Sequence, residues 1–481
     1  MADHVDVLVI GAGISGVCAA HYLAHDLPEH SFLVVEARDR IGGTWDLFRY
    51  PGIRSDSDMY TFGFSFRPWS GPGVADGPAI RAYVEQTVKD EGLDAHIRFG
   101  VRVERVVWSS EAARWTVEAR HLASGEARTF TCRFLIAGTG YYRYDQGYTP
   151  DFPGMEQFGG AIVHPQQWPE GLEVAGKRVA VIGSGATAIT LVPALAEQGA
   201  HVTMIQRSPT YVIGRPQHDP NAEWLRRWLP ERAAYRAIRW RNVVFGLLWY
   251  QYCRRFPDRT RKMIRDGTEA FLGGVIDVGE HFDPPYDPWD QRMCLAPDGD
   301  FFEALKARKA TIVTSQVTSF TEGGVAVASG QEVPADIVVT ATGLVLQFLG
   351  GADMVVDGEV VDLSKTRMYR GTMLSDVPNA AFLMGYTNAS WTLKAELSMQ
   401  YLTRLLAHLE TKRYRSVVPR KTDPGVAELP ALDLDAGYIR RALDDLPSQG
   451  SKLPWRVYQN YLLDNWLYRA TAIEDGVLAF A

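Results

Sequence analysis

The amino-acid sequence predicts an α/β fold with two Rossmann-like dinucleotide-binding domains, the second inserted into the first. Two glycine-rich loops, at residues 11–16 and 183–188, support this prediction because each follows a short apolar strand and precedes a helix. Strand-to-glycine turns at residues 134–140 and 337–343 indicate the insertion. A chain that leaves one domain to build another must return, and each crossing needs such a turn.

The first loop reads Gly-Ala-Gly-Ile-Ser-Gly after the apolar strand at residues 5–10, and a helical pattern follows. Glycines at these spacings allow a tight turn, close backbone approach to a pyrophosphate, and close packing of the helix on the strand. We therefore expect a dinucleotide phosphate to lie against Gly11, Gly13, Ser15 and Gly16.

An acidic side chain indicates which nucleotide this loop binds. The next strand, residues 32–35, ends at Glu36, which lies twenty residues beyond Gly16. A carboxylate at that distance accepts hydrogen bonds from both ribose hydroxyls and repels a 2′-phosphate. The first site therefore suits FAD or NAD and not NADP. The alternative interpretation of the loop is a glycine turn that binds no ligand.

The second loop has a basic residue at the corresponding place. Ala188 replaces the third glycine, and the strand at residues 201–205 leads to Arg207. A guanidinium binds phosphate through two parallel hydrogen bonds, and a neighbouring hydroxyl adds a donor. This arrangement predicts NADPH, and the alternative is that Arg207 is a solvated charge at a strand end. The residues expected to bind this nucleotide are Gly183, Ser184, Gly185, Thr187, Arg207 and Ser208.

Composition excludes several classes of protein. The chain has 481 residues and a net charge of −7, so it has no general basic surface for nucleic acid. Its four cysteines lack paired spacing, which argues against a disulfide framework, a metal cluster and a disulfide reductase. No signal peptide precedes the first strand, and no apolar run reaches the ~18 residues of a membrane span. We expect a cytoplasmic protein without a metal.

The crossings divide the chain into five segments. The expected FAD-binding domain comprises residues 1–144 and 346–481. The expected NADP-binding domain comprises residues 145–213 and 291–345, and residues 214–290 form a helical insert within it.

The insert has many basic side chains, Arg239 among them, around an apolar stretch at residues 243–253. Three interpretations stay open for these helices. They contact an anionic membrane surface, they present a basic face to solvent and an apolar face to the core, or they line a substrate pocket.

Two further motifs resemble those of a known family. The segment between the two loops reads F-x-G-x-x-x-H-x-x-x-W-P, and the segment after Glu36 contains G-x-W-x-x-x-x-Y-P-G-x-x-x-D. Nearly from end to end, the sequence resembles type I Baeyer–Villiger monooxygenases, which are class B flavoprotein monooxygenases, and within them the ethionamide-activating branch. The matching positions are Phe158, Gly160, His164 and Trp168 in the first motif, and Gly43, Trp45, Tyr50, Pro51, Gly52 and Asp56 in the second.

The resemblance implies FAD, NADPH, molecular oxygen and a small-molecule substrate. The implied reaction inserts one oxygen atom beside a ketone carbonyl through a C4a-peroxyflavin, giving an ester or lactone, with sulfide or thioamide oxygenation as a side activity. Related flavin monooxygenases that oxidise amines and sulfides share the Phe-Gly-His part of the first motif but usually lack Trp168. They are the alternative.

This chemistry needs a permanent positive charge near an anionic peroxide, and arginine cannot lose its proton. In the family a Lys-Arg pair after the helical insert supplies that charge. Arg292 matches the arginine, and Gln291 replaces the lysine, which leaves more of the NADPH preference to Arg207. Asp56 matches a carboxylate that positions the arginine. The alternative for Arg292 is a salt bridge between domains. The presence of Arg292 argues against a simple NADPH–flavin reductase.

Other positions complete the expected site. His164 lies on the link between the domains, where a hinge or packing role suits it better than proton transfer. A helical pattern at residues 392–409 follows Asn388, and its N-terminus would stabilise negative charge on a reduced flavin. A capped core helix is the alternative. The positions expected to contact FAD also include Gly43, Thr44, Trp45, Asp56, Tyr60, Val103 and Asn388.

Overall fold

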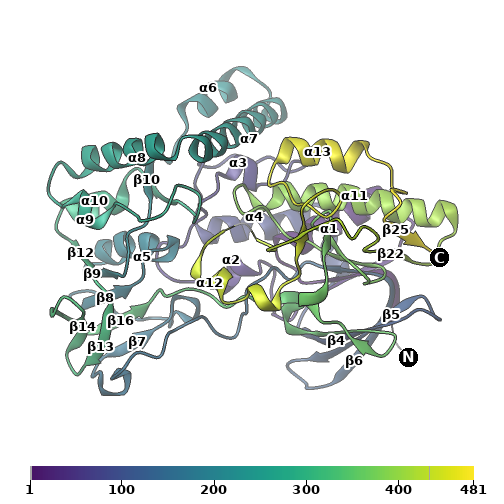
Figure 1. The fold of residues 1–481 in the computed structure, drawn as a ribbon, viewed down its shortest axis with the longest axis horizontal. Helices are drawn as coiled ribbons and strands as arrows, with labels where there is room; N and C mark the ends of the chain where they lie inside the picture. The colour runs from purple at the N-terminus through teal and green to yellow at the C-terminus, as the bar shows by residue number, and fades with distance from the viewer. Residues whose placement is uncertain (1–2, 433) are drawn as a thin grey trace.

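The computed structural model describes residues 3–432 and 434–481, and it has the predicted α/β fold, in which two large sheets are separate from each other (Figure 1). The first sheet uses strands from both ends of the chain. Strands β1, β2, β6 and β21 are parallel to one another, and β4, β5 and β6 form an antiparallel meander. In order across the sheet the strands are β18 (Glu359–Val360), β17 (Asp353–Val356), β4 (Val101–Ser109), β5 (Arg114–His121), β6 (Ala127–Ala137), β1 (Asp3–Ile10), β2 (Phe32–Val35) and β3 (Ile97–Arg98), with β21 (Ala380–Phe382) also paired to β6.

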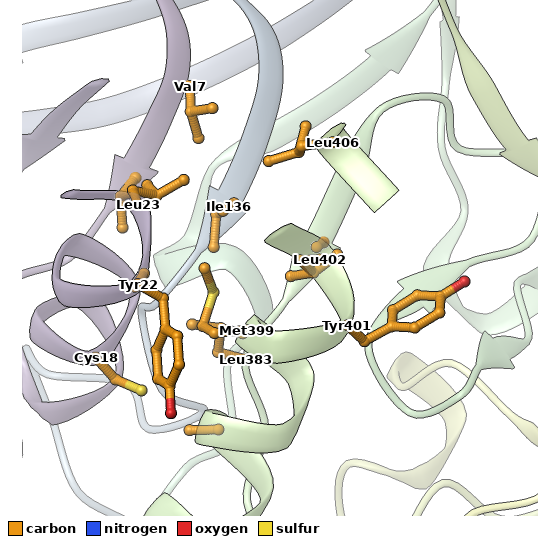
Figure 2. Close-up of a cluster of buried hydrophobic side chains, with 14 of the residues drawn as sticks. Val7, Cys18, Tyr22, Leu23, Ile136, Leu383, Met399, Tyr401, Leu402 and Leu406 are labelled. Carbon is orange, nitrogen blue, oxygen red and sulfur yellow. The ribbon is translucent and has the colours of Figure 1, made fainter. Parts of the chain in front are cut away.

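Helices α1 (Ile14–Asp26) and α11 (Trp391–Lys412) pack against each other beside this sheet. Figure 2 shows their buried side chains meeting those of β1 and β6: the contributing residues include Val7, Cys18, Tyr22, Leu23, Ile136, Met399, Leu402 and Leu406. Burial of each large apolar side chain contributes about 1.5–3 kcal/mol. The glycine loop that precedes α1 is therefore fixed by a helix from the C-terminal part of the chain.

The second sheet is entirely parallel, in the order β12 (Ala310–Thr314), β9 (His201–Gln206), β8 (Arg178–Ile182), β16 (Ile337–Thr340) and β7 (Ala161–Val163). Alternate residues of β8 serve its two faces. Val179 and Val181 pack with helix α5 (Ala186–Glu197), and Ala180 and Ile182 pack with an antiparallel meander. The strands of that meander are β13 (Val317–Thr321), β14 (Gly324–Val327) and β15 (Glu332–Pro334).

The insert is helical, as the sequence predicted. It lies between β10 (Val212–Arg215) and β11 (Cys294–Pro297) and contains α6 (Pro220–Trp228), α7 (Glu231–Arg255), α8 (Pro257–Leu272) and α9 (Val278–His281). The Asp219 carboxylate accepts hydrogen bonds from the first N–H groups of α6, and Gly273 ends α8 at a φ of 59°. Across residues 3–432 and 434–481, no helix combines the length and apolarity of a bilayer span.

One basic side chain of the insert is buried, so not every basic residue of these helices lies on a face exposed to solvent. Arg239 of α7 is 6% exposed, and it donates to the carbonyl of Tyr60 at 3.0 Å and to Glu396 of α11 at 3.1 Å. A buried charge left without its partner costs about 3–5 kcal/mol. The pair therefore fastens α7 to the first domain.

The two crossings between the sheets run side by side and are called here the linker pair, residues 141–148 and 343–347. Tyr142 pairs antiparallel with Leu346, and further backbone hydrogen bonds of 2.9–3.0 Å join the two segments. The inserted domain is thus connected to the first domain through one double-stranded joint.

The remaining α-helices and strands are α2 (Thr44–Leu47), α3 (Met59–Phe62), α4 (Gly77–Asp90), α10 (Asp300–Lys306), α12 (Gly437–Arg440), α13 (Tyr461–Ala470), β19 (Met368–Tyr369), β20 (Met373–Leu374), β22 (Val417–Pro419), β23 (Glu428–Leu429), β24 (Gln449–Gly450) and β25 (Leu478–Phe480).

Candidate functional site

A cavity of about 550 Å³ lies where the two domains meet. The first glycine loop, the segment at residues 42–57, the linker pair and the N-terminus of α5 line it. Eleven of the expected site residues line this cavity: Gly11, Gly13, Ser15, Glu36, Gly43, Thr44, Trp45, Asp56, Val103, Thr187 and Arg292.

The first glycine loop presents bare backbone to the cavity. Gly11 has a φ of 97°, a conformation that side chains disfavour, and Gly16 packs directly beneath it. A Cβ on Gly16 would lie 1.7 Å from the carbonyl oxygen of Gly11. Gly16 itself does not line the cavity, and its role is to let α1 begin immediately behind the loop. The free N–H groups at this helix start suit a pyrophosphate.

Glu36 directly follows β2, lines the cavity and is held by backbone groups. Its carboxylate oxygens accept hydrogen bonds from the N–H groups of Ala12 at 2.7 Å and of Arg38 at 2.8 Å. Burial raises the pKa of Glu36, and these two hydrogen bonds oppose that rise. Each oxygen keeps a further lone pair, so the carboxylate fits the two hydroxyls of an adenosine ribose.

Asn388, near the first site, has a buried side-chain oxygen without a hydrogen-bond donor among the described residues. Its Nδ2 donates to the carbonyl of Gln459 at 2.9 Å, but its buried Oδ1 has no hydrogen-bond partner among the described residues. The neighbouring Thr387 and Ala389 both line the cavity. A buried acceptor without a donor is rare in proteins, so this position fits a ligand that donates a hydrogen bond, as a flavin ring does.

The second glycine loop also suits a dinucleotide. Gly183 has a φ of 136°, and the position where a Cβ on Gly185 would stand is open space. The Ser184 hydroxyl donates to the carbonyl of Ser208 at 3.1 Å, which ties the loop to the end of β9. Arg207 is exposed beside them and forms no hydrogen bond or ion pair within the part of the chain that the structure describes. An unpaired guanidinium here fits a 2′-phosphate.

Arg292 reaches the cavity from the segment before β11. It is open to solvent within the cavity, and it makes no hydrogen bond or ion pair with any residue that the structure describes. Burial lowers the pKa of Arg292, but neighbouring groups, the Asp56 carboxylate among them, outweigh this effect and raise it. The guanidinium therefore stays charged, with its hydrogen-bond donors available to a ligand.

Asp56 faces Arg292 without a direct ion pair. Burial raises the pKa of Asp56, and the charges of Arg292 and Arg54 lower it. The expected contact that would fix the guanidinium is thus replaced by a longer-range attraction. Arg54 is itself paired with Asp300 of α10, so this side of the cavity is connected to the inserted domain.

Tyr60 lies outside the cavity, which corrects the expectation that it contacts the flavin. Its ring packs against Ala222, Tyr235 and Ile238 of the insert, and its hydroxyl donates to the carbonyl of Gly71 at 3.4 Å. The aromatic side chains of the segment at residues 42–69 lie in two different places. Trp45 lines the cavity, whereas Tyr60 anchors α7.

Three residues of the connecting motif, the F-x-G-x-x-x-H-x-x-x-W-P segment at residues 158–169, have structural roles. Phe158 packs edge-to-face on Phe320 of the meander, with ring centroids 5.9 Å apart. A Cβ on Gly160 would lie 2.2 Å from the carbonyl oxygen of Asp336, so only glycine lets β7 approach β16 here. Trp168 packs on the core of the second domain. These three residues lie away from the cavity.

His164 bridges the connecting motif and the linker pair. Its Nε2 lies 3.1 Å from the carbonyl oxygen of Gly343, and its Nδ1 lies 3.1 Å from the N–H of Gln166. A neutral ring with the proton on Nε2 satisfies both contacts. Burial lowers the pKa of His164, and the Gly343 carbonyl partly opposes this. The geometry suits the expected hinge or packing role.

Protonation of His164 should weaken this joint. Because its pKa in the folded protein lies below the ordinary value of 6.5, the unfolded chain binds the proton more readily. The contribution of His164 to stability is complete above pH 6.5 and is lost as the pH falls below it. His164→Gln should therefore show a smaller drop in melting temperature than the wild type when the pH is lowered through this range. The exposed His201→Gln is the control and should keep the wild-type drop; an equal drop in His164→Gln would contradict the assignment.

The sequence did not indicate four aromatic residues of the site. Tyr141, Tyr142 and Tyr438 surround Arg292, and burial raises the pKa of each, so their hydroxyls stay protonated. Trp391, at the start of α11, donates from Nε1 to the hydroxyl of Ser15 at 2.7 Å. Tyr141 and Tyr142 directly follow a glycine turn that sequence reasoning had located. Tyr438 comes from a C-terminal segment with no recognisable motif.

Comparisons with known proteins agree with this architecture. A family model described as pyridine nucleotide-disulphide oxidoreductase matches residues 5–232. The FAD-containing monooxygenase EthA of Mycobacterium tuberculosis is 51% identical over 484 residues, covering 100% of this chain and 98% of EthA. A solved structure of an oxidized steroid monooxygenase bound to NADP matches with a TM-score of 0.77 and 24% identity over 99% of both chains. An open crystal structure of cyclohexanone monooxygenase matches with a TM-score of 0.72 and 22% identity over 87% of this chain and 90% of that one.

The fold, with one glycine loop in each domain, is that of an oxidoreductase with two nucleotide sites. All four cysteines are free and buried, which separates the chain from disulfide reductases of the matched family model. The chain belongs to the family of FAD-containing monooxygenases that includes EthA.

Proposed function

We propose that the protein uses FAD, NADPH and molecular oxygen to insert one oxygen atom beside a ketone carbonyl, giving an ester or lactone. The observation that carries the proposal is the unpaired guanidinium of Arg292 in a cavity that the first glycine loop and Glu36 also line. The relatives support the cofactors, since EthA is named as FAD-containing and the steroid monooxygenase structure contains NADP.

The glycine loops would hold the nucleotides, and Arg292 would stabilise the negative charge that develops in the reaction. When bound and reduced by NADPH, FAD supplies an activated oxygen derived from O₂. Arg292 stabilises negative charge on the attacking oxygen and on the carbonyl oxygen, and its charge does not depend on pH. The Tyr142 hydroxyl donates to the hydroxyl of Tyr141 at 3.3 Å, so the protonated Tyr141 hydroxyl is left as a further donor near this position.

A product assay tests the proposal. The purified FAD-loaded enzyme is incubated with NADPH in air and with linear, cyclic and aryl ketones, and an aryl sulfide is included in the panel. We expect esters or lactones from at least one class of ketone, with sulfoxide as a side product. Sulfoxide formation without any ester would replace the proposal with an amine- and sulfide-oxidising monooxygenase, and NADPH oxidation without either product would make the protein a flavin reductase.

Nucleotide choice gives a separate test. Arg207→Ala should raise the KM for NADPH while leaving the KM for NADH nearly unchanged, because only the contact with the 2′-phosphate is lost. Loss of one charge-assisted contact is worth about 1.5–3 kcal/mol, or roughly ten- to a hundredfold. Steady-state kinetics with both nucleotides measure the effect.

Two companion variants sharpen that experiment. Lys309→Ala removes an exposed cation at the amino end of β12 in the same sheet and should change neither constant. Gln291→Lys restores the family's lysine and should increase the preference for NADPH. Equal losses with NADPH and NADH in Arg207→Ala would mean that Arg207 supports the fold instead of the phosphate.

A further inference from the structure

The insert presents an apolar face to solvent. Ten of the twenty large hydrophobic side chains that are exposed in the described part of the chain lie between residues 220 and 272. On α7, Trp240, Val244, Leu248 and Tyr252 follow one another at intervals of four residues and therefore form one row. Leu248 is 63% exposed, and the adjacent Phe245 is 61% exposed. Side chains of this size are normally buried, so this row lacks a partner.

Two neighbouring helices extend the row into a broader surface. Trp224 and Trp228 of α6 are 59% and 73% exposed, and α6 packs alongside α7. On the other side, the ring of Trp240 lies 5.9 Å from that of Tyr461 of α13, where Trp466 is 61% exposed. Figure 1 shows α6, α7 and α13 along one edge of the molecule. We call this the α6–α7–α13 face.

The charge of this region is opposite to that of the rest of the chain. Residues 220–272 contain twelve Lys or Arg and five Asp or Glu, a net charge of +7, whereas the whole chain carries −7. Four exposed arginines there form no hydrogen bond or ion pair with the residues that the structure describes: Arg227, Arg232, Arg236 and Arg255. Apolar and aromatic side chains surrounded by arginine are typical of surfaces that lie in the interface of an anionic bilayer.

We infer that the α6–α7–α13 face docks on an anionic lipid surface, with its aromatic and aliphatic side chains inserted among the acyl chains. A second copy of the chain fits less well. A symmetric dimer places the same surface on both subunits, so two faces that each contain the +7 segment would meet. Lipid phosphates instead supply the missing negative charge.

The docked face would be separated from the cavity by one helix. Val243, on the inner side of α7, packs against Tyr386 and Leu393, and Tyr386 lines the cavity. The buried Arg239–Glu396 pair holds α7 in this position. The row that contacts lipid and the wall of the cavity therefore belong to the same rigid helix.

Vesicle binding tests the inference on the FAD-loaded protein. Flotation with vesicles of phosphatidylcholine and phosphatidylglycerol should recover the wild type in the lipid fraction. Phosphatidylcholine alone, or high salt, should recover much less, because arginine–phosphate attraction is screened. The Phe245→Ser and Leu248→Ser variants should each lower the partition coefficient about tenfold, as expected for loss of a large inserted side chain. Arg232→Gln and Arg255→Gln should each lower it roughly fivefold.

A matched control and an assembly measurement make the result decisive. Val360→Ser removes a side chain that is 71% exposed on β18, away from the insert, and should bind vesicles like the wild type. Unchanged FAD content and melting temperature show that each variant is folded. Wild-type protein that does not float with anionic vesicles would overturn the inference. So would a dimer in sedimentation velocity that Phe245→Ser dissociates, because the face would then bind a second copy.

Discussion

Arg292→Ala should lose nearly all ester formation from ketones while it still binds FAD and is still reduced by NADPH. Removal of a group that stabilises a developing oxyanion costs on the order of 3 kcal/mol or more, which corresponds to roughly two or three powers of ten in rate. Oxygen consumption should continue, because NADPH, a proton and O₂ still yield NADP⁺ and hydrogen peroxide. The loss should therefore appear as uncoupling and not as failure to react with oxygen.

The measurement separates the two half-reactions. Anaerobic stopped-flow mixing with NADPH gives the rate of flavin reduction, and product and peroxide assays in air give the coupling. Arg292→Lys keeps a positive charge but not the planar, forked set of donors, so its coupling should fall between those of wild type and Arg292→Ala. Arg308→Ala, an exposed arginine after α10, serves as the control and should stay coupled. Ketone turnover that survives in Arg292→Ala would remove this residue from the mechanism.

Gly16→Ala should give protein without FAD, or protein that does not fold. The new Cβ would stand 1.7 Å from the carbonyl oxygen of Gly11 and 2.8 Å from its carbonyl carbon. Both atoms belong to the backbone of the nucleotide loop, so neither can rotate away as a side chain would. The start of α1 must move off β1, and the loop loses the shape that admits a pyrophosphate. Flavin absorbance per protein and the melting temperature report the two effects.

The second loop supplies the matched control. Gly185 has the same place in its loop as Gly13 has in the first, and a Cβ there would meet no atom within 4 Å. Gly185→Ala should therefore keep FAD and the wild-type melting temperature, and any loss should be confined to the KM for NADPH. Gly16→Ala with a full complement of FAD would show that the close contact of α1 with the loop is not required.

The sequence predicted the parts of the fold that depend on local pattern. Strand β2 begins and ends where the apolar run at residues 32–35 does, and the helices of the insert occur where expected. It could not predict that β17 pairs with β4, because these strands are about 250 residues apart and no local signal links them. Pairing of this kind depends on the packing of the whole domain.

The site shows the same division. Arg292 and Glu36 were found because each has a fixed place relative to a motif. Tyr438 was missed because it reaches the cavity through α12, a single turn of helix without a motif. Tyr60 was expected to contact the flavin because it lies in an aromatic-rich segment. The sequence of such a segment does not show in which direction each side chain points. Only the packing of α7 against that segment turns Tyr60 away from the cavity.

The linker pair has a consequence for how such enzymes diversify. Because the two crossings are hydrogen-bonded to each other, the inserted domain begins and ends at one place on the host domain. A domain whose two ends are adjacent can be exchanged between relatives as one segment, because the path of the host chain does not have to change. The Arg239–Glu396 pair sets the condition for a successful exchange. A donor segment that includes α7 must bring an arginine at that position, or the host will be left with an unmatched carboxylate in its interior.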